Sequence, residues 1–449
     1  MSPRSRQTSL YKMQYPKTRH RKLHPELSSD AQVTPAAAQH TLFRGFEPIP
    51  LIIPRPNHKI SRKNIDKEAL KVLYRLKDHG YLAYLVGGSV RDLLLNRKPK
   101  DFDIGTNARP EELRKIFRHS RIIGRRFRLV HVYFKGGKII EVSTFRQTPG
   151  CNDDFDSDTY DENIYGTPEQ DAFRRDLTIN GLFYNIADFS IIDYVGGMED
   201  LKNCIIRVIG DSECRFLRDP VRMLRAIRHA ARTGFKIEPN TWNAIKTHAD
   251  KIRLCSVARV RDEFLKDLHS GAAHPWTSLM LESGLLPYVF PGYATALNRE
   301  NRPTTTKLLL KLSYEIDKII NNSRSPIDEA FLMAVFLYPA IHCDERFQSL
   351  YSTRLRWPIY ETRSVVEDVL SPYDFRRDIR DHIAKILAGY WTIDFCVREN
   401  TWPRKVQRRD TFEASLYLYN KVQTIFGHPP AKFTKVKRRR RRPRPKRSK

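Results

Sequence analysis

The sequence predicts an α+β fold, with a small mixed sheet and its helices in the first half and helices alone in the second. Three observations predict it. Between residues 61 and about 208, short apolar segments with a period of two alternate with helical segments. From residue 212 onward the strand pattern fades into amphipathic helical periods that end in glycine or turn residues. Both ends of the 449-residue chain are basic and poor in apolar residues, so we expect them to be disordered.

The length allows two to four folded domains. The composition shifts divide the chain into five expected parts. They are a basic extension (1–60), an α/β head (61–210), a helical neck (211–272), a helical body (273–425) and an Arg/Lys-rich tail (426–449).

The head should begin with an amphipathic helix at 64–80 that ends at Gly80. A second helix is expected at 109–120. Two apolar stretches, 121–134 and 138–146, are separated by a Gly-Gly turn and predict the strands of a hairpin. Two further strands are expected at 191–197 and 205–210.

In the second half, helices are expected at 219–234, 241–252, 257–271 and 372–391. The longest apolar run, 331–341, is too short to span a bilayer and contains a proline, so it predicts a buried core helix. The sequence also has no secretory signal pattern.

Asp101 and Asp103 are the most informative residues of the head. Side chains at i and i+2 of a strand point to the same face. Two carboxylates on one face repel each other unless a cation lies between them, so the pair indicates a divalent metal site. An acidic loop without a metal is the alternative interpretation.

The glycine pair Gly87-Gly88 precedes these acids. A Gly-Gly turn lets backbone N–H groups approach a phosphate closely, and Ser89 adds a hydroxyl at the same place. The turn and the acids together predict a nucleotide held by its phosphates beside metal-binding carboxylates.

Two further groups are candidates for the same site. Glu141, at the centre of the strand 138–146, would supply a third carboxylate or would face solvent as an ordinary strand residue. Arg174 and Arg175 offer planar donor forks suited to phosphate or ribose oxygens. An amphipathic helix with a charged start is the alternative explanation for these arginines.

Four motifs in order resemble those of the class II nucleotidyltransferases, the bacterial poly(A) polymerases and the CCA-adding tRNA nucleotidyltransferases. They are GGSVRD, DFD, RRDLTIN and RDPVRMLRAIR, and the resemblance covers roughly residues 60–300. The segment 122–132 (IIGRRFRLVHV) and the basic tail are similar to the poly(A) polymerase branch.

The resemblance implies a nucleotidyltransferase head with ATP as substrate. Asp101 and Asp103 would hold two Mg²⁺ ions, with Mn²⁺ as the alternative, and Asp176 would lie close enough to them to be catalytic. An RNA 3′-hydroxyl would attack the α-phosphate in line. The nucleotide-binding residues implied in the head are Gly87, Gly88, Ser89, Arg91, Arg174, Arg175 and Asn180.

The resemblance also implies that a neck helix selects the base through Asp219 and Arg222, at i and i+3 on one helix face. Arg225 and Arg228 are expected to bind nucleotide from the same helix. Two residues depart from the family pattern: Arg218 replaces a glutamate and His229 replaces a phenylalanine. These departures put the strictness of base selection in doubt, and a plain basic amphipathic helix is the alternative.

Charge independently favours a nucleic-acid partner. Lys and Arg number 80 against 51 acids, giving a formal net charge of +29 and a pI near 9.9, and such a surplus attracts polyanions. The tail is expected to contact RNA phosphates, with a nuclear-address signal as the alternative. For the N-terminal stretch, an RNA-binding extension is favoured over an organelle transit peptide.

Six scattered cysteines without a C-x-x-C pair argue against zinc and a disulfide framework, and fit the cytoplasm.

The predicted function is template-independent addition of AMP from ATP to the 3′ ends of mRNA and other RNAs, promoting their decay. A CCA-adding tRNA nucleotidyltransferase and a non-catalytic RNA-binding protein are the alternatives. The expected partners are RNA 3′ ends, ATP, and RNA-decay or RNA-chaperone proteins. We expect a monomer without membrane contact.

Overall fold

The computed structural model describes residues 49–432 except 125–127, 148–163, 298–299 and 301. The expectations for residues 1–48 and for the tail from 433 onward therefore lie outside the described residues.

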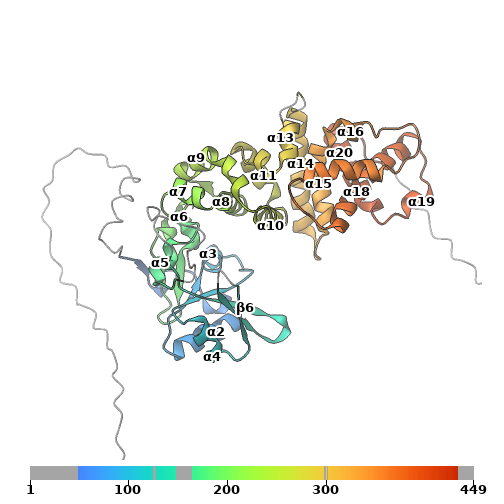
Figure 1. The fold of residues 1–449 in the computed structure, drawn as a ribbon. Helices are drawn as coiled ribbons and strands as arrows, with labels where there is room; N and C mark the ends of the chain where they lie inside the picture. The colour runs from blue at the N-terminus through green and yellow to red at the C-terminus, as the bar shows by residue number, and fades with distance from the viewer. Residues whose placement is uncertain (1–48, 125–127, 148–163, 298–299, 301, 433–449) are drawn as a thin grey trace, which may run out of the picture. The chain divides into compact units, whose positions relative to one another are not determined.

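The head is built on an eight-stranded mixed sheet in the order β1-β8-β7-β2-β3-β6-β5-β4 (Figure 1). Strands β3 and β6 pair in parallel, whereas the other neighbours pair antiparallel. This arrangement confirms the predicted mixed sheet. The strands are β1 (Leu51–Ile53), β2 (Ala83–Val86), β3 (Asp103–Thr106), β4 (Ser120–Ile123), β5 (Leu129–Tyr133), β6 (Ile139–Thr144), β7 (Leu182–Asn185) and β8 (Ile191–Asp193).

The two faces of the sheet have separate apolar clusters, because successive side chains of a strand alternate between the faces. Leu85, Ile104 and Val142 belong to the large core that includes the buried residues of α2 (Lys67–Asp78). Val86 and Phe183 belong to a smaller cluster on the other face. The small cluster lies on the face that carries the predicted acids.

Helix α2 shows how the sequence specifies a head element. Its N-cap is Asp66, whose side chain accepts hydrogen bonds from the backbone N–H groups of Glu68 and Ala69. Its buried residues recur at i, i+3, i+4 and i+7, as an amphipathic helix requires. The chain leaves the helix through Gly80, whose φ of +82° favours glycine. The prediction for 64–80 is confirmed.

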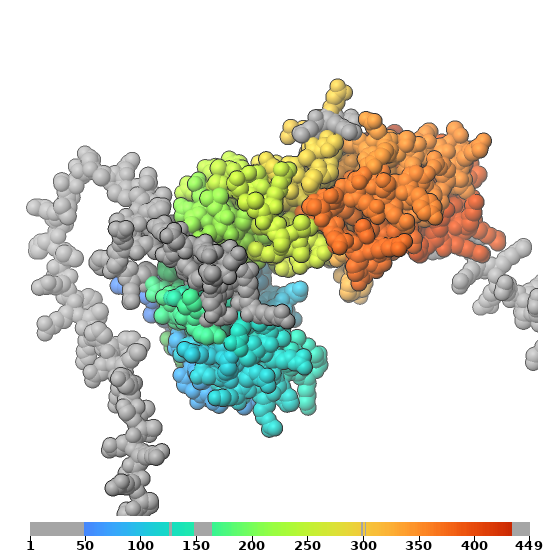
Figure 2. All heavy atoms as spheres, viewed as in Figure 1, coloured from blue at the N-terminus to red at the C-terminus, as the bar shows by residue number. Residues whose placement is uncertain are grey.

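Among the described residues beyond 211, nearly all of the regular structure is helical (Figure 1). Helix α15 is buried along almost its whole length, which confirms the predicted core helix at 331–341. Helices α14, α17 and α18 contact it, within the yellow-to-red part of the chain in Figure 2. The longer helices are α8 (Val221–Thr233), α9 (Pro239–Thr247), α10 (Val257–Leu268), α11 (Ala273–Glu282), α14 (Arg302–Asn322), α15 (Glu329–His342), α17 (Ile359–Leu370), α18 (Arg377–Arg398) and α20 (Phe412–Phe426).

Shorter helices connect these elements. They are α3 (Gly88–Leu94), α4 (Pro110–Ile116), α5 (Pro168–Phe173), α6 (Gly197–Asn203), α7 (Ser212–Arg218), α12 (Leu286–Val289), α13 (Pro291–Leu297), α16 (Glu345–Gln348) and α19 (Arg404–Gln407). The 3₁₀ turns are η1 (Arg55–Asn57), η2 (Arg62–Asn64), η3 (Lys135–Gly137), η4 (Thr178–Asn180) and η5 (Ala249–Leu254).

Two parts of the domain prediction need correction. Strand β1 pairs with β8, so the head begins within the stretch 1–60 that was assigned to a disordered extension. Three residues beside prolines are too short a run to show a period of two. In addition, β9 (Ile205–Ile206) pairs in parallel with β10 (Lys236–Ile237), so the expected all-helical neck shares a small sheet with the head.

Among the described residues no helix is both long enough and apolar enough to cross a membrane. Cys204, Cys255, Cys343 and Cys396 form no disulfide bond, whereas Cys214 is disulfide-bonded. The scattered spacing of the cysteines gave no signal for that bond.

Candidate active site

Two predicted carboxylates, Asp103 and Glu141, lie side by side on neighbouring interior strands of the sheet, and Asp101 precedes the first of them. Asp103 is the first residue of β3, in register with Val86 of β2 and Glu141 of β6. Burial, followed by the negative charge of Glu141, raises the pKa of Asp103 to about 6. The positive charge of Arg175 lowers this pKa, and the negative charge of Asp101 raises it further. Asp103 nevertheless belongs to the exposed residues, so a cation and a substrate can reach its carboxylate.

Glu141 has its own partner on the neighbouring strand. His131 of β5 lies in register with it, and its Nε2 atom is 3.2 Å from Oε1 of Glu141. Glu141 is also exposed. The structure thus places it beside Asp103 as a third carboxylate would require, and its role in catalysis stays a prediction.

The Gly-Gly turn lies between β2 and α3. Gly87 has a φ of +70°, and a Cβ atom there would lie only 3.1 Å from Nη1 of Arg175. Glycine therefore allows both the backbone conformation and the close approach of this guanidinium. A Cβ atom at Gly88 would lie 3.3 Å from Nη2 of Arg91. Both glycines are thus packed against predicted nucleotide-binding arginines.

The hydroxyl of Ser89 already has a partner within the turn. Its side chain is buried, and its hydroxyl donates to the Val86 carbonyl at 2.9 Å. The only hydroxyl proton is used inside the β2–α3 turn. The predicted contact of Ser89 with a nucleotide stays a prediction.

Arg174 and Arg175 are held by a residue that the sequence analysis missed. Asp171 is 1% exposed; its Oδ1 accepts from Nε of Arg174 at 2.7 Å and its Oδ2 from Nη2 of Arg175 at 2.8 Å. Burial opposes ionisation, but the two arginines hold the pKa of Asp171 below its ordinary value. Asp171 precedes these arginines by three and four residues on α5, and this helical spacing was a usable signal.

Arg215 of α7 is a second residue that was missed. Its Nη2 atom donates to the carbonyl oxygens of Phe173 and Arg175, at 3.0 and 2.5 Å. Burial, followed by the charge of Arg222, lowers the pKa of Arg215 to about 9. Arg215 thus ties the backbone of the two-arginine segment to the neck.

Arg91, Asn180 and His229 bring three motifs together. Nη1 of Arg91 donates to Oδ1 of Asn180 at 2.6 Å and lies 3.2 Å from Nδ1 of His229. Nδ2 of Asn180 lies 3.4 Å from Nε2 of the same ring. Burial, reinforced by the positive charge of Arg91, lowers the pKa of His229 well below its usual value. The ring is therefore neutral at pH 7.

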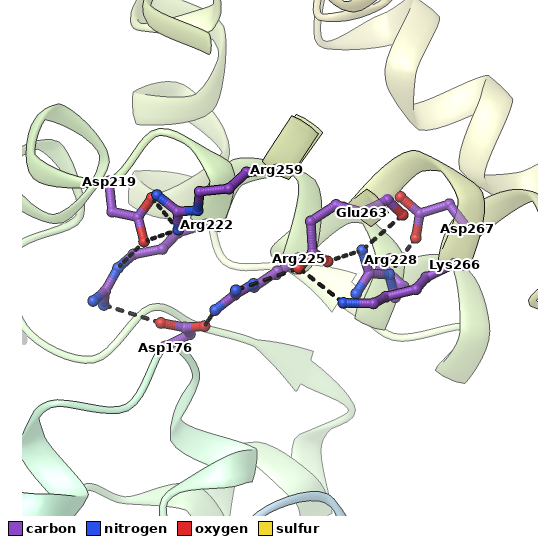
Figure 3. A network of polar contacts seen from close by, with 9 residues as sticks. All are labelled: Asp176, Asp219, Arg222, Arg225, Arg228, Arg259, Glu263, Lys266 and Asp267. Atoms are coloured by element: carbon purple, nitrogen blue, oxygen red, sulfur yellow. Dashed lines mark hydrogen bonds and ion pairs between the residues drawn. The ribbon is translucent and has the colours of Figure 1, made fainter. Parts of the chain in front are cut away.

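Asp176 joins the head to the neck (Figure 3). Its Oδ1 lies 3.1 Å from Nη1 of Arg222, and its Oδ2 accepts from Nη1 of Arg225 at 2.7 Å. Burial opposes ionisation, yet the charges of Arg222 and Arg225 lower the pKa of Asp176 below its ordinary value. Both carboxylate oxygens face neck arginines, and the predicted contact of Asp176 with metal ions stays untested.

Asp219 and Arg222 are adjacent, but they do not share a helix. Asp219 is the C-cap of α7, one residue before Pro220, and Arg222 lies in the first turn of α8. The proline cannot donate the backbone hydrogen bond that would continue α7, so the helix breaks there. Nε of Arg222 lies 3.7 Å from Oδ2 of Asp219, and Nη2 of Arg259 lies 3.0 Å from both Asp219 oxygens (Figure 3).

Arg225 and Arg228 face carboxylates of α10. Nη2 of Arg225 lies 3.3 Å from Oε1 of Glu263, while Arg228 pairs with both Glu263 and Asp267 (Figure 3). Glu263 and Asp267 are buried, so these pairs are little screened by solvent. The predicted nucleotide contacts of Arg225 and Arg228 stay predictions, whereas their role in joining α8 to α10 is a structural finding.

The carboxylates suit a hard cation that keeps other oxygen ligands. Within the described part of the chain, no group of three or more His, Cys, Asp or Glu residues is placed to enclose a metal ion. Mg²⁺ is commonly bound through one or two carboxylates together with waters and substrate phosphates. The mutual repulsion that raises the pKa of Asp103 is what a divalent cation would relieve. The donor set therefore fits Mg²⁺ bound together with a triphosphate.

Comparisons with known proteins agree with this geometry. A family model described as the poly A polymerase head domain matches residues 83–207. A second, described as a probable RNA and SrmB-binding site of polymerase A, matches residues 234–297. Poly(A) polymerase I of Haemophilus influenzae is 34% identical over 362 residues, which is 79% of this chain and 74% of that protein. The chain belongs to the poly(A) polymerase family.

Other relatives define the extent of the similarity. Poly(A) polymerase I of Escherichia coli O157:H7 is 44% identical over 307 residues, covering 66% of this chain and 65% of that protein. The chain thus matches less than two thirds of the length of this relative. A CCA-adding enzyme of Lactobacillus helveticus is 43% identical over 201 residues, 44% of this chain and 49% of that one.

A solved structure supports the fold. The CCA-adding enzyme of Bacillus stearothermophilus in complex with CTP has a TM-score of 0.61 and 29% identity. The match covers 81% of this chain and 79% of that one. The mixed-sheet head followed by helices is thus shared with nucleotide-adding enzymes.

Proposed function

We propose that this chain transfers AMP from ATP to RNA 3′ ends without a nucleic-acid template. The observation that best supports this is that Asp103 lies in register with Glu141, next to the Gly87 turn that Arg175 approaches. Carboxylates beside a guanidinium suit a cation-bound triphosphate, because phosphoryl transfer depends mainly on positioning and charge neutralisation.

The role proposed for Arg175 follows from its hydrogen bonds. Asp171 accepts from its Nε and Nη2 atoms. Nη1 remains, and it faces the Gly87 turn. A guanidinium fixed on one side and open on the other can donate to a phosphate oxygen without first losing conformational freedom. Asp171 is then a positioning residue for phosphate binding.

Asp101 and Asp103 are proposed to hold two Mg²⁺ ions together with the triphosphate. Bound there, the cations would neutralise charge on the triphosphate and lower the pKa of the RNA 3′-hydroxyl. The carboxylates supply the negative charge that would attract the cations to the start of β3. Asn180, held by Arg91 and beside His229, is proposed to contact the ribose of the incoming nucleotide.

Asp219 and Arg222 are proposed to recognise the base. A carboxylate accepts and a guanidinium donates, so the pair can complement the Watson–Crick edge of one base. Arg259 holds Asp219, and Asp176 holds Arg222. Because both recognition groups are restrained by partners, they present one arrangement, which favours an enzyme that adds a single kind of nucleotide.

A CCA-adding activity is the second candidate, because CCA-adding enzymes share the fold and the head sequence. Poly(A) addition is favoured because similarity to poly(A) polymerase I extends over 66–79% of the chain, against 44% for the Lactobacillus enzyme.

Incubating the protein with labelled RNA and each single NTP separates the candidates. Poly(A) addition predicts long products with ATP alone and none with CTP, GTP or UTP. A CCA-adding enzyme would extend a tRNA lacking its end by two or three nucleotides and would require CTP.

We further propose that the tails mark RNA for decay, because an unpaired adenylate tail gives a 3′ exonuclease a single-stranded start. Transcript half-lives measured with and without the protein test this role. Unchanged half-lives would contradict it while leaving the proposed chemistry intact.

A further inference from the structure

A pocket of about 560 Å³ lies on the head, among η1, η2, α2 and the turn between β7 and β8. Arg55, Arg62, Lys63 and Lys67 line it, and no carboxylate is among the described residues of its wall. Neither Lys63 nor Lys67 makes an ion pair within the described part of the chain. The pocket is thus a concentration of uncompensated positive charge, which attracts phosphate groups.

The pocket is separate from the candidate active site. Tyr184 lines the pocket and pairs with Leu85 of β2. Its neighbour Phe183 pairs with Val86. Val86 is in register with Asp103 on the next strand. Side chains of adjacent strand residues point to opposite faces. Tyr184 and Asp103 therefore lie on opposite faces of the sheet.

Tyr184 carries a polar group without a partner. Its side chain is 0% exposed, and its hydroxyl makes no hydrogen bond to any described residue. Burial raises the pKa of this hydroxyl, so it keeps its proton and can donate. A buried donor without an acceptor is unfavourable in the folded chain, and an acceptor brought by a ligand would remove this cost.

Aromatic rings give the pocket a flat surface. The Arg62 guanidinium lies over the Phe189 ring, 4.6 Å from its centroid, and Nη1 of Arg62 donates to the Tyr74 hydroxyl at 2.8 Å. Phe189 has a φ of +63°, which a bulky residue rarely adopts. Nε2 of His58 donates to the Phe189 carbonyl at 2.8 Å and so helps to hold this backbone conformation. The Phe189 ring and the Arg62 guanidinium together can stack a nucleobase.

We infer that this pocket binds a nucleoside phosphate unit. Its base stacks on Arg62 and Phe189, its phosphate meets the lysines and Arg55, and the Tyr184 hydroxyl donates to one of its oxygens. The unit comes either from an RNA chain that passes the back of the head or from a free nucleotide. The volume is sufficient for either, since small-ligand pockets typically measure about 300–1,000 Å³.

Photocrosslinking of the full chain tests the site and identifies the source. One arm uses RNA with 4-thiouridine, the other 8-azido-ATP, and cross-linked peptides are mapped by mass spectrometry. We expect labelling of the Tyr184–Phe189 segment in at least one arm, reduced at least fivefold in the double variant Arg62→Ala, Lys63→Ala. Lys71→Ala is the matched control, because Lys71 lies on α2 outside the pocket. No labelling of this segment in either arm, or labelling unaffected by the double variant, would overturn the inference.

Tyr184→Phe gives an independent test that does not disturb the fold. Removing an unpartnered hydroxyl should leave the melting temperature of the unliganded protein unchanged or higher, while weakening binding of the labelling ligand threefold or more. A lower melting temperature, or unchanged binding, would show that the hydroxyl does not serve a ligand. AMP incorporation into a short primer at saturating substrate should be unchanged in every pocket variant. If the wild type itself incorporates no AMP, that result contradicts the proposed function and does not bear on ligand binding in this pocket.

Discussion

Nη1 of Arg225 lies 2.7 Å from Oδ2 of Asp176, so a carboxylate of the head and a guanidinium of the neck form a direct ion pair across the two parts. The second Asp176 oxygen faces Arg222, and the second Arg225 terminal nitrogen faces Glu263. Arg222 and Arg225 are therefore held by the head, and Arg225 is also held by α10.

Asp176→Asn should uncouple these parts. The substitution keeps the shape but removes the charge that compensates Arg222 and Arg225, and we expect a stability loss of about 1–3 kcal/mol. The KM for ATP should rise about tenfold or more, because base recognition loses its support. Urea unfolding and steady-state kinetics measure both effects. Asp262→Asn, at an exposed carboxylate paired with Arg261, is the control and should change neither.

Ser89→Ala should have a small effect on catalysis. The hydroxyl donates to the Val86 carbonyl, so its loss should lower stability by about 0.5–1.5 kcal/mol. We expect kcat/KM to fall by less than about threefold, since a fall of that size corresponds to under 1 kcal/mol. A loss of a hundredfold in kcat/KM would instead indicate that the hydroxyl contacts the triphosphate.

His229→Phe should change how stability depends on pH. The folded pKa of His229 lies well below its unfolded value, so the folded state binds fewer protons. Its contribution to stability is therefore complete above about pH 6.5 and is lost as the pH falls toward the folded pKa, by at most about 1.4 kcal/mol per pH unit. The measurement is urea unfolding of wild type and variant from pH 8 to pH 5. The wild type should lose more stability over this range; parallel curves would contradict the assignment.

Mg²⁺ should stabilise the protein through Asp103. Neutralising the repulsion among Asp103, Glu141 and Asp101 favours the folded state, so millimolar Mg²⁺ with ATP should raise the melting temperature of the wild type. Asp103→Asn should remove most of this increase, while its melting temperature without metal should equal or exceed that of the wild type. A thermal shift that is the same in both proteins would place the cation elsewhere.

Local patterns were sufficient to predict much of the fold. The hairpin of β5 and β6, helix α2 and the buried helix α15 follow from period and length within single segments. Strand β1 was missed because three residues cannot show a period, and its pairing with β8 depends on residues about 140 positions away.

The candidate site shows the same limit. The i, i+2 spacing of Asp101 and Asp103 was visible in the sequence, and the structure places Glu141 beside Asp103. The residues that restrain the arginines were not visible, because Glu263 and Asp267 lie more than 30 positions from Arg225 and Arg228. Only the fold brings α10 against α8. Asp171 is the exception, since its helical spacing to Arg174 and Arg175 was available.

The most direct measurement is incorporation of labelled AMP into RNA by the wild type and by Asp103→Asn, with RNA binding measured in parallel. We predict long ATP-dependent extension by the wild type, a loss of at least about a thousandfold in the variant, and RNA affinity within about twofold in both. Extension by Asp103→Asn at a rate near that of the wild type would contradict the proposed active site.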